Sequence, residues 1–146
     1  MKEDKIYHAL IKDIIVIEEF NQLKKIKHHG TSRYEHCCRV SYYSYKYSKM
    51  LKLDFKACAR AGLLHDFFSS PEDRTKFQRI MSTFTHPKYA LKNALSLFEL
   101  NNMEKNIIRS HMFPVNLYIP KYAEAWLVSF VDKGVAIYEF FRIIKK

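Results

Sequence analysis

The chain has 146 residues, of which 48% are hydrophobic, and its 25 Lys and Arg against 15 Asp and Glu give a formal net charge of +10. This length and hydrophobic content exclude a disordered chain and predict one globular domain over residues 1–146. The positive charge favours anionic ligands or a nucleic-acid or membrane surface, although a solvated lysine-rich surface gives the same excess.

The spacing of apolar residues predicts an all-α fold. The chain has only three glycines and four prolines, and its apolar residues recur at three- and four-residue intervals rather than in alternation. Its three cysteines are an odd number without paired-ligand spacing, which favours buried thiols in a reduced, cytoplasmic protein over disulfides or a zinc finger. No apolar run reaches the roughly 18 residues of a membrane span, and residues 1–5 lack the apolar stretch of a signal peptide. We therefore expect no membrane contact.

The first predicted helix runs from about Asp4 to Lys25, where apolar residues mark one face. A basic break follows, closed by His28 and His29 before Gly30. These two histidines could be metal ligands, but beside a helix end they are more often exposed or capping. We keep His29 as a candidate to support a ligand rather than to bind the metal.

Ser32 and Glu35 form a capping box, so a second helix starts at Ser32. The stripe expected to face the core contains His36, and a lone histidine there is usually a satisfied core residue; the full stripe is His36, Val40, Tyr43, Tyr47 and Met50 or Leu51. Four tyrosines at positions 42, 43, 45 and 47 could stack on bases, but helical spacing favours Tyr43 and Tyr47 as core residues.

Asp54 is placed to cap the next helix, which ends in the run AGLLHD at His65 and Asp66. Gly62 within it costs roughly 1 kcal/mol relative to Ala, which a close contact with another helix would explain. The polar stretch 71–81 is expected to form a loop with a short helix. Before Pro87 the helical region is disfavoured, so His86 is expected at the mouth of a helix that begins at Pro87.

Two further helices complete the chain. Asn101 and Glu104 form another capping box, and the helix that follows carries His111 on its apolar stripe before it ends at residues 112–114. The last helix runs from about Tyr122 towards Ile143 and places Asp132 on its inner face. A buried unpaired aspartate is costly, so Asp132 should have a cationic partner.

Each of these polar residues has an ordinary explanation alone, but together they lie on the inner stripes or ends of separate helices. They form a set of nitrogen and oxygen donors without a thiolate, which suits Mn, Fe, Co, Ni or Mg better than structural zinc. The sequence therefore predicts a metal site inside a helical bundle, with the ligands His36, His65, Asp66, His86, His111 and Asp132.

The order of these residues resembles the HD-domain superfamily of metal-dependent phosphohydrolases, and most closely small single-domain bacterial members without an assigned substrate. The resemblance covers roughly Gly30 to Gly134 and is carried by SRYEHCCRVSYYS, AGLLHD, HPKYALKNA, IIRSHMFP and VDKG. In those relatives an aromatic and acidic segment with another histidine tends to follow the His-Asp pair. This chain has FFSSPE there instead, over residues 67–72.

The resemblance implies a compact bundle of about six to seven helices with one or two divalent ions, of Mn, Fe, Co or Ni, with Mg possible. It assigns one ion to His36, His65, Asp66 and Asp132. It assigns His86 and His111 to a second ion, with Asp66 bridging the two.

The activity that the resemblance implies is hydrolysis of a nucleotide or another small phosphomonoester or phosphodiester by a metal-activated water, without a protein nucleophile. We expect Asp66, Lys133 and Arg33 to serve catalysis, with Arg33 and Lys133 contacting phosphate. Arg39 and Arg109 are further candidates for substrate binding.

Two other functions are open at this level. A bundle that keeps its metal could act as a non-catalytic, metal- and nucleotide-binding regulatory module. A basic nucleic-acid binder is not favoured, because no recognised binding motif is present and the basic residues are spread along the chain. The sequence leaves the oligomeric state open.

Overall fold

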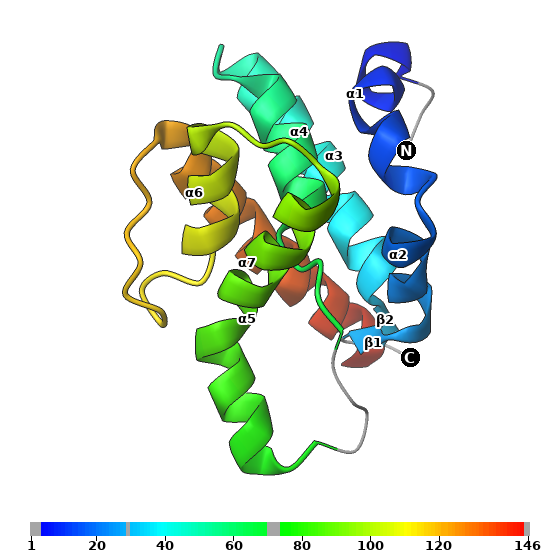
Figure 1. Ribbon diagram of the computed structural model, residues 1–146, viewed down its shortest axis with the longest axis vertical. Coiled ribbons are helices and arrows are strands. Elements are labelled where there is room, and N and C mark those ends of the chain that lie inside the picture. Colours follow the sequence, from blue (N-terminus) through cyan, green and yellow to red (C-terminus); the bar gives the residue numbers. More distant parts are fainter. Residues whose placement is uncertain (1–3, 29, 70–73, 145–146) are drawn as a thin grey trace.

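The computed structural model describes residues 4–28, 30–69 and 74–144, and it confirms the predicted all-α fold (Figure 1). Besides the α-helices, the described residues form one 3₁₀ helix and one pair of two-residue antiparallel strands. The elements in chain order are α1 (Lys5–Ile15), α2 (Glu18–Asn21), η1 (Gln22–Lys25), β1 (Lys27–His28), β2 (Thr31–Ser32), α3 (Arg33–Met50), α4 (Phe55–Leu64), α5 (Lys76–Leu97), α6 (Asn102–Ser110) and α7 (Ala123–Ile144).

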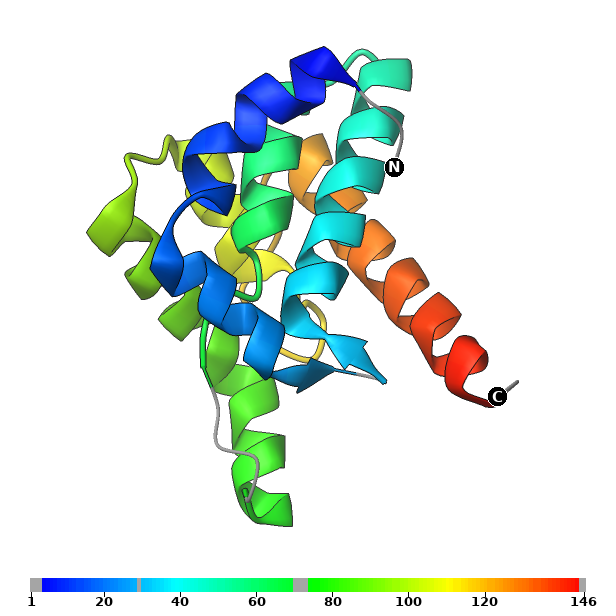
Figure 2. The ribbon, with the colours of Figure 1, turned by 90° about the vertical axis from the view of Figure 1, so that its right-hand side faces the viewer.

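Helix α4 lies at the centre of the bundle and is buried along nearly its whole length, up to Leu64 just before His65. It packs most extensively against α3, and Figures 1 and 2 show the two helices side by side. At their crossing a Cβ on Gly62 would lie 3.2 Å from Ser41 Cα, which confirms the predicted close helix contact. Ser41 Oγ also donates a hydrogen bond to Ala59 O at 2.7 Å. Small residues thus set the separation of these helices.

The predicted caps begin three of the helices. Ser32 Oγ accepts the Glu35 amide at 3.1 Å at the start of α3, but the Glu35 carboxylate accepts from Thr31 Oγ1 instead, so only half of the predicted capping box forms. Asp54 caps α4 through the Ala57 amide at 3.0 Å. Asn101 and Glu104 form the complete reciprocal capping box of α6. These side chains satisfy amides that have no partner within the helix, so the helix starts could be predicted from local sequence.

The expectation of one helix from Asp4 to Lys25 is wrong, because the chain breaks after Ile15. Ile17 is extended (ψ 133°), and Asn21 Nδ2 donates to the carbonyls of Ile15 at 2.8 Å and Ile17 at 2.9 Å. An asparagine side chain that takes over helix carbonyls in this way favours a helix end. The break redirects the chain and lets Phe20 become fully buried.

The inner face predicted for α3 is also partly wrong. Tyr43 and Tyr47 are 38% and 42% exposed, whereas Tyr45 is 2% exposed. The buried face consists largely of small residues, because α3 packs closely against α4 on one side and contacts α7 on another. The expected core positions Met50 and Leu51 are exposed as well. Tyr43 and Tyr47 thus face outward, and serines of α3 are buried against the neighbouring helices.

Helix α5 begins well before Pro87, contrary to the expectation that it starts there. Thr75 and Gln78 form a reciprocal capping box that starts α5 at Lys76, and the helix continues through Pro87. A proline inside a helix loses one backbone hydrogen bond and crowds the preceding turn, but this cost is local. His86 therefore lies in mid-helix. Of the expected loop 71–81, residues 71–73 lie outside the described ranges and 76–81 belong to α5.

The first half of α5 projects from the body of the molecule in both views (Figures 1 and 2). The three cysteines are free, and Cys37 and Cys58 are buried, as expected for core thiols. Among the described helices, none combines the length and the apolar character needed to cross a membrane.

Candidate metal centre

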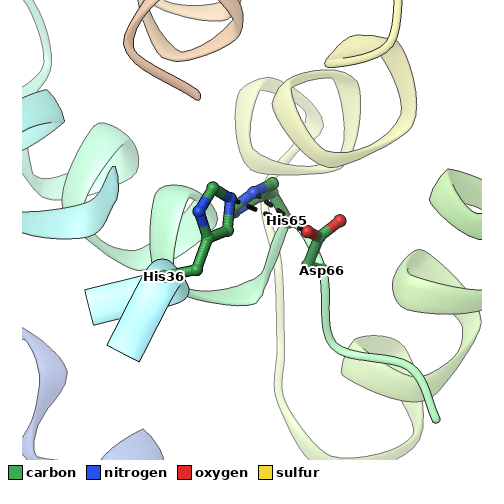
Figure 3. A group of neighbouring side chains, drawn as sticks. All are labelled: His36, His65 and Asp66. Carbon is green, nitrogen blue, oxygen red and sulfur yellow. Dashed lines mark ion pairs between the residues drawn. The ribbon is translucent and has the colours of Figure 1, made fainter. Parts of the chain in front are cut away.

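All six predicted metal ligands meet at one place in the bundle, although they come from five helices. His36 lies in the first turn of α3, and His65 and Asp66 directly follow α4 (Figure 3). The other three come from α5, the end of α6 and the middle of α7; they are His86, His111 and Asp132. Every one of the six is buried except His86, which is partly exposed. Their binding of a metal stays a prediction.

The first group of donors surrounds the gap between α3, α4 and α7. Asp132 Oδ1 lies 2.9 Å from His36 Nε2 and 3.2 Å from His65 Nε2. Asp66 Oδ2 lies 3.8 Å and 3.5 Å from the same two nitrogens. Atoms bound to one ion at about 2.1 Å are themselves roughly 3–4 Å apart, so this spacing suits a single divalent ion.

The second group shares Asp66 with the first. Asp66 Oδ1 lies 3.2 Å from His86 Nε2 and 3.4 Å from His111 Nε2, and these two nitrogens are 2.9 Å apart. Asp66 therefore turns one oxygen towards each group. This is the arrangement that a carboxylate bridging two ions requires.

The other ring nitrogen of each histidine faces an acceptor, which fixes the tautomer. The Nδ1 atoms of His65, His86 and His111 lie 2.6–2.8 Å from the backbone carbonyls of Gly62, Ser82 and Ile108. His36 Nδ1 lies 2.8 Å from Glu139 Oε1. Because each Nδ1 must donate to its acceptor, each neutral ring directs an unprotonated Nε2 into the cluster.

These tautomers leave the centre of the cluster with acceptors and no donor. Asp66 Oδ1 is buried without a hydrogen bond, and the nitrogens of His86 and His111 beside it carry lone pairs. Four imidazole nitrogens and two carboxylates facing one another in a buried space require positive charge between them. The residues present therefore fit one or two divalent ions bound by nitrogen and oxygen.

The electrostatics of the protein alone point the same way. Burial by itself would lower the pKa of His36, but hydrogen bonds to Asp132 and Glu139 raise it to about 10. Burial would raise the pKa of Asp66, yet the neighbouring histidines, His65 foremost, hold it well below its usual range. Despite burial, the pKa of Asp132 is likewise held well below its usual range, His65 again being the main lowering cause, so both carboxylates are ionised and a proton on His36 offsets part of their charge when no metal is bound.

A cavity of about 800 Å³ opens beside the cluster and reaches both aspartates. Arg33 lines it from within: its side chain is 4% exposed, its guanidinium lies 3.9 Å from the Phe68 ring centre, and its Nη1 donates to Phe68 O at 2.6 Å. Lys133 also lines it, and its Nζ donates to Ser129 Oγ at 2.6 Å and to His111 O at 3.1 Å. Both predicted phosphate contacts therefore lie in the wall of the cavity.

The two weaker candidates lie elsewhere. Arg39 Nη1 is 2.7 Å from Glu139 Oε2, on the side of His36 that faces away from the aspartates, and Arg39 lines a different hollow. The Arg109 guanidinium lies 4.6 Å from the Tyr118 ring centre. Neither arginine is among the residues that line the cavity. His29 lies outside the described residues.

Two contacts at the site were not foreseen. Glu139 is 2% exposed and holds His36 from behind, and Phe68 stacks on His86 with ring centres 4.9 Å apart. Glu139 could have been found, because it follows Asp132 by seven residues on the same face of a helix and is an acid among apolar neighbours. The sequence does not single out Phe68 in this way, since an aromatic residue that follows a buried helix is expected in the hydrophobic core.

The sequence matches a model of a known protein family over most of its length. The family model described as HD domain matches residues 33–136, which include every residue of the cluster. We find no significant match to the chain among curated proteins or among solved structures. Because the family model matches most of the chain and the matched residues include the cluster, this protein belongs to the HD domain family.

Proposed function

We propose that this protein is a metal-dependent phosphohydrolase that acts on a nucleotide or another small phosphate ester. The observation that carries the proposal is the buried set of four Nε2 atoms and two carboxylates that open into a cavity with basic walls. Divalent ions held by these residues would supply Lewis acidity and an activated water for attack on phosphorus.

The chain's own residues do the remaining work. The carboxylates of Asp66 and Asp132 would offset the charge of the bound ions. The Nδ1 hydrogen bonds keep the four histidine rings in the tautomer whose unprotonated Nε2 faces the cluster. Lys133, fixed by Ser129 beside Asp132, can neutralise charge on a non-bridging phosphate oxygen. Arg33, whose guanidinium lies over the Phe68 ring, can contact a second oxygen of the same group.

The test is a phosphate-release assay on the purified protein, loaded separately and anaerobically with Mn, Fe, Co, Ni and Mg. Generic phosphoesters and a panel of nucleotides are the substrates. We expect turnover with at least one metal, lost in Asp66→Ala and retained in the control Asp13→Asn, which alters a carboxylate on the exposed face of α1. Metal-loaded protein that binds nucleotides saturably without cleaving any of them would instead support the regulatory module.

Metal analysis of the same samples tests the number of ions. Asp66 faces both donor groups, whereas His86 belongs to one of them. We expect Asp66→Ala to lose nearly all bound metal and His86→Ala to lose about half. Unchanged metal content in His86→Ala would reduce the site to one ion.

A further inference from the structure

The cavity beside the metal centre carries more positive charge than one phosphate group can use. Its described lining includes five basic residues, Lys27, Arg33, Arg74, Arg79 and Lys133, and only the two aspartates of the cluster are acidic. Within the described ranges, Lys27, Arg74 and Arg79 form no ion pair with a carboxylate. Two divalent ions would add further positive charge to this balance.

Arg79 is carried by a part of α5 that lies away from the cluster. Lys133 is next to Asp132, whereas Arg79 lies two turns before His86 on α5, and Ser82, Thr83 and His86 line the cavity between them. Seven residues of helix span about 10 Å. A phosphate that reacts at the cluster is therefore well separated from the backbone that carries Arg79.

Arg74 has a buried donor without a partner among the described residues. Its Nε is buried without a hydrogen bond, although the residue lines the cavity. It also lies close enough to Arg33 to affect it: burial is the main cause that lowers the pKa of Arg33, Asp66 opposes this, and Arg74 adds to the lowering. Both guanidinium groups are positively charged, so an anion bound at Arg74 relieves their repulsion.

We infer that the substrate carries at least two phosphate groups, of which one reacts at the metal centre while Arg74 and Arg79 bind another. This inference rests on the proposed function for the first phosphate and adds a second anion site to it. Arg74 and Arg79 then determine specificity: they select polyphosphorylated or bisphosphorylated substrates over monophosphates without touching the reacting group.

The experiment compares two ligands that cannot be hydrolysed, hexane-1,6-bisphosphonate and hexylphosphonate, which share a chain and differ only in the second anionic group. Binding to the Mn-loaded protein is measured by calorimetry. We expect the bisphosphonate to bind at least ten-fold more tightly. Each of Arg74→Gln and Arg79→Gln should reduce this preference by about five- to ten-fold and change hexylphosphonate affinity less than two-fold, because a charge-assisted hydrogen bond is lost only to the second group.

Lys92→Gln is the control, since it removes one charge from an exposed position of α5 that does not line the cavity. Equal affinity for the two ligands, or an equal loss for both in the arginine variants, would overturn the inference. The two proposals fail differently. Preference for the bisphosphonate in a protein that cleaves no phosphoester keeps the anion site and rejects the enzyme, whereas turnover without this preference does the reverse.

Discussion

The histidines of the metal centre owe their orientation to two kinds of contact. His65 and His111 each cap the end of a helix, and their rings fold back to a carbonyl of the last turn, at Gly62 and Ile108. Carbonyls at a helix end lack a partner within the helix, so this hydrogen bond serves both groups. His36 differs, because Glu139 on α7 holds it from 103 residues further along the chain.

Replacement of Glu139 by Gln should therefore weaken metal binding without unfolding the protein. Loss of the charged acceptor lowers the basicity of His36 and loosens its ring, and such changes typically reduce metal affinity by about 10- to 100-fold. Competition with a chromophoric chelator measures the affinity.

The matched control is Glu35→Gln, which removes an exposed carboxylate that pairs with the same Arg39 at 3.4 Å. It should bind metal as the wild type does. Equal affinity in Glu139→Gln and the wild type would show that the contact behind His36 does not affect the metal.

At the level of single residues, sequence located the cluster because its members interrupt apolar stripes. His36, His111 and Asp132 are polar at positions where burial is otherwise expected, and such interruptions can be seen without a structure. Arg39 could not be judged in this way. An arginine one turn from a ligand can point to either side, and the position of Glu139 on a distant helix determines which side it takes.

At the level of the helices, two glycines that lie within helices, Gly62 in α4 and Gly134 in α7, make a paired test of packing. Alanine favours a helix over glycine by about 1 kcal/mol. At Gly62 the added Cβ would lie 3.2 Å from the backbone of Ser41, whereas at Gly134 it would meet nothing within 4 Å.

We expect Gly62→Ala to lower the free energy of unfolding by about 1–3 kcal/mol, because α3 and α4 must move apart. Gly134→Ala should raise it by up to about 1 kcal/mol. Urea denaturation followed by circular dichroism measures both. A Gly62→Ala protein as stable as Gly134→Ala would mean that Ser41 yields readily.

The helices also show where local sequence rules stop. Capping boxes at Thr75 and Asn101 start α5 and α6, and of these the one at Asn101 was predicted from the sequence. Pro87 wrongly predicted a helix start at residue 87. The helix capped by Thr75 has already begun at Lys76 and continues through Pro87. For α3, the hydrophobicity of Tyr43 and Tyr47 misled, because close packing against α4 selects small residues rather than large apolar ones.

At the scale of the whole molecule, Arg60 joins three helices. Its Nη atoms donate to Asp13 at 2.6 Å and 2.9 Å and to Leu10 O on α1 at 2.7 Å, and its Nε lies 3.6 Å from Glu104 on α6. The hydrogen bond from Arg60 lowers the pKa of Asp13. A lowered carboxyl pKa stabilises the folded state above the unfolded pKa, and this stabilisation is lost as the pH falls through the folded value.

Asp13→Asn should consequently destabilise the protein more at pH 7 than at pH 3. The effect should stay below about 1 kcal/mol, since the Asp13 side chain is largely exposed and water screens the pair. Urea denaturation at the two pH values measures the difference. Glu19→Gln, an exposed change of the same charge on α2, should show no comparable pH dependence.

Metal removal should loosen α7 more than α4. Asp132 joins α7 to the cluster through the metal and its histidine partners, whereas α4 is held by buried apolar contacts on all sides. Amide hydrogen exchange before and after chelation measures this: we expect protection to fall most over residues 123–144. Equal loss of protection in both helices would indicate that the metal stabilises the bundle as one unit.

The two kinds of histidine contact also bear on the order in which the site can form. His65, His86 and His111 each need only the helix that carries them to take the ligand tautomer. During synthesis, a nascent chain that has emerged as far as α6 already contains everything that orients these three rings. Glu139, the partner of His36, and Asp132 are made last, so the cluster can be completed only after α7 has been synthesised.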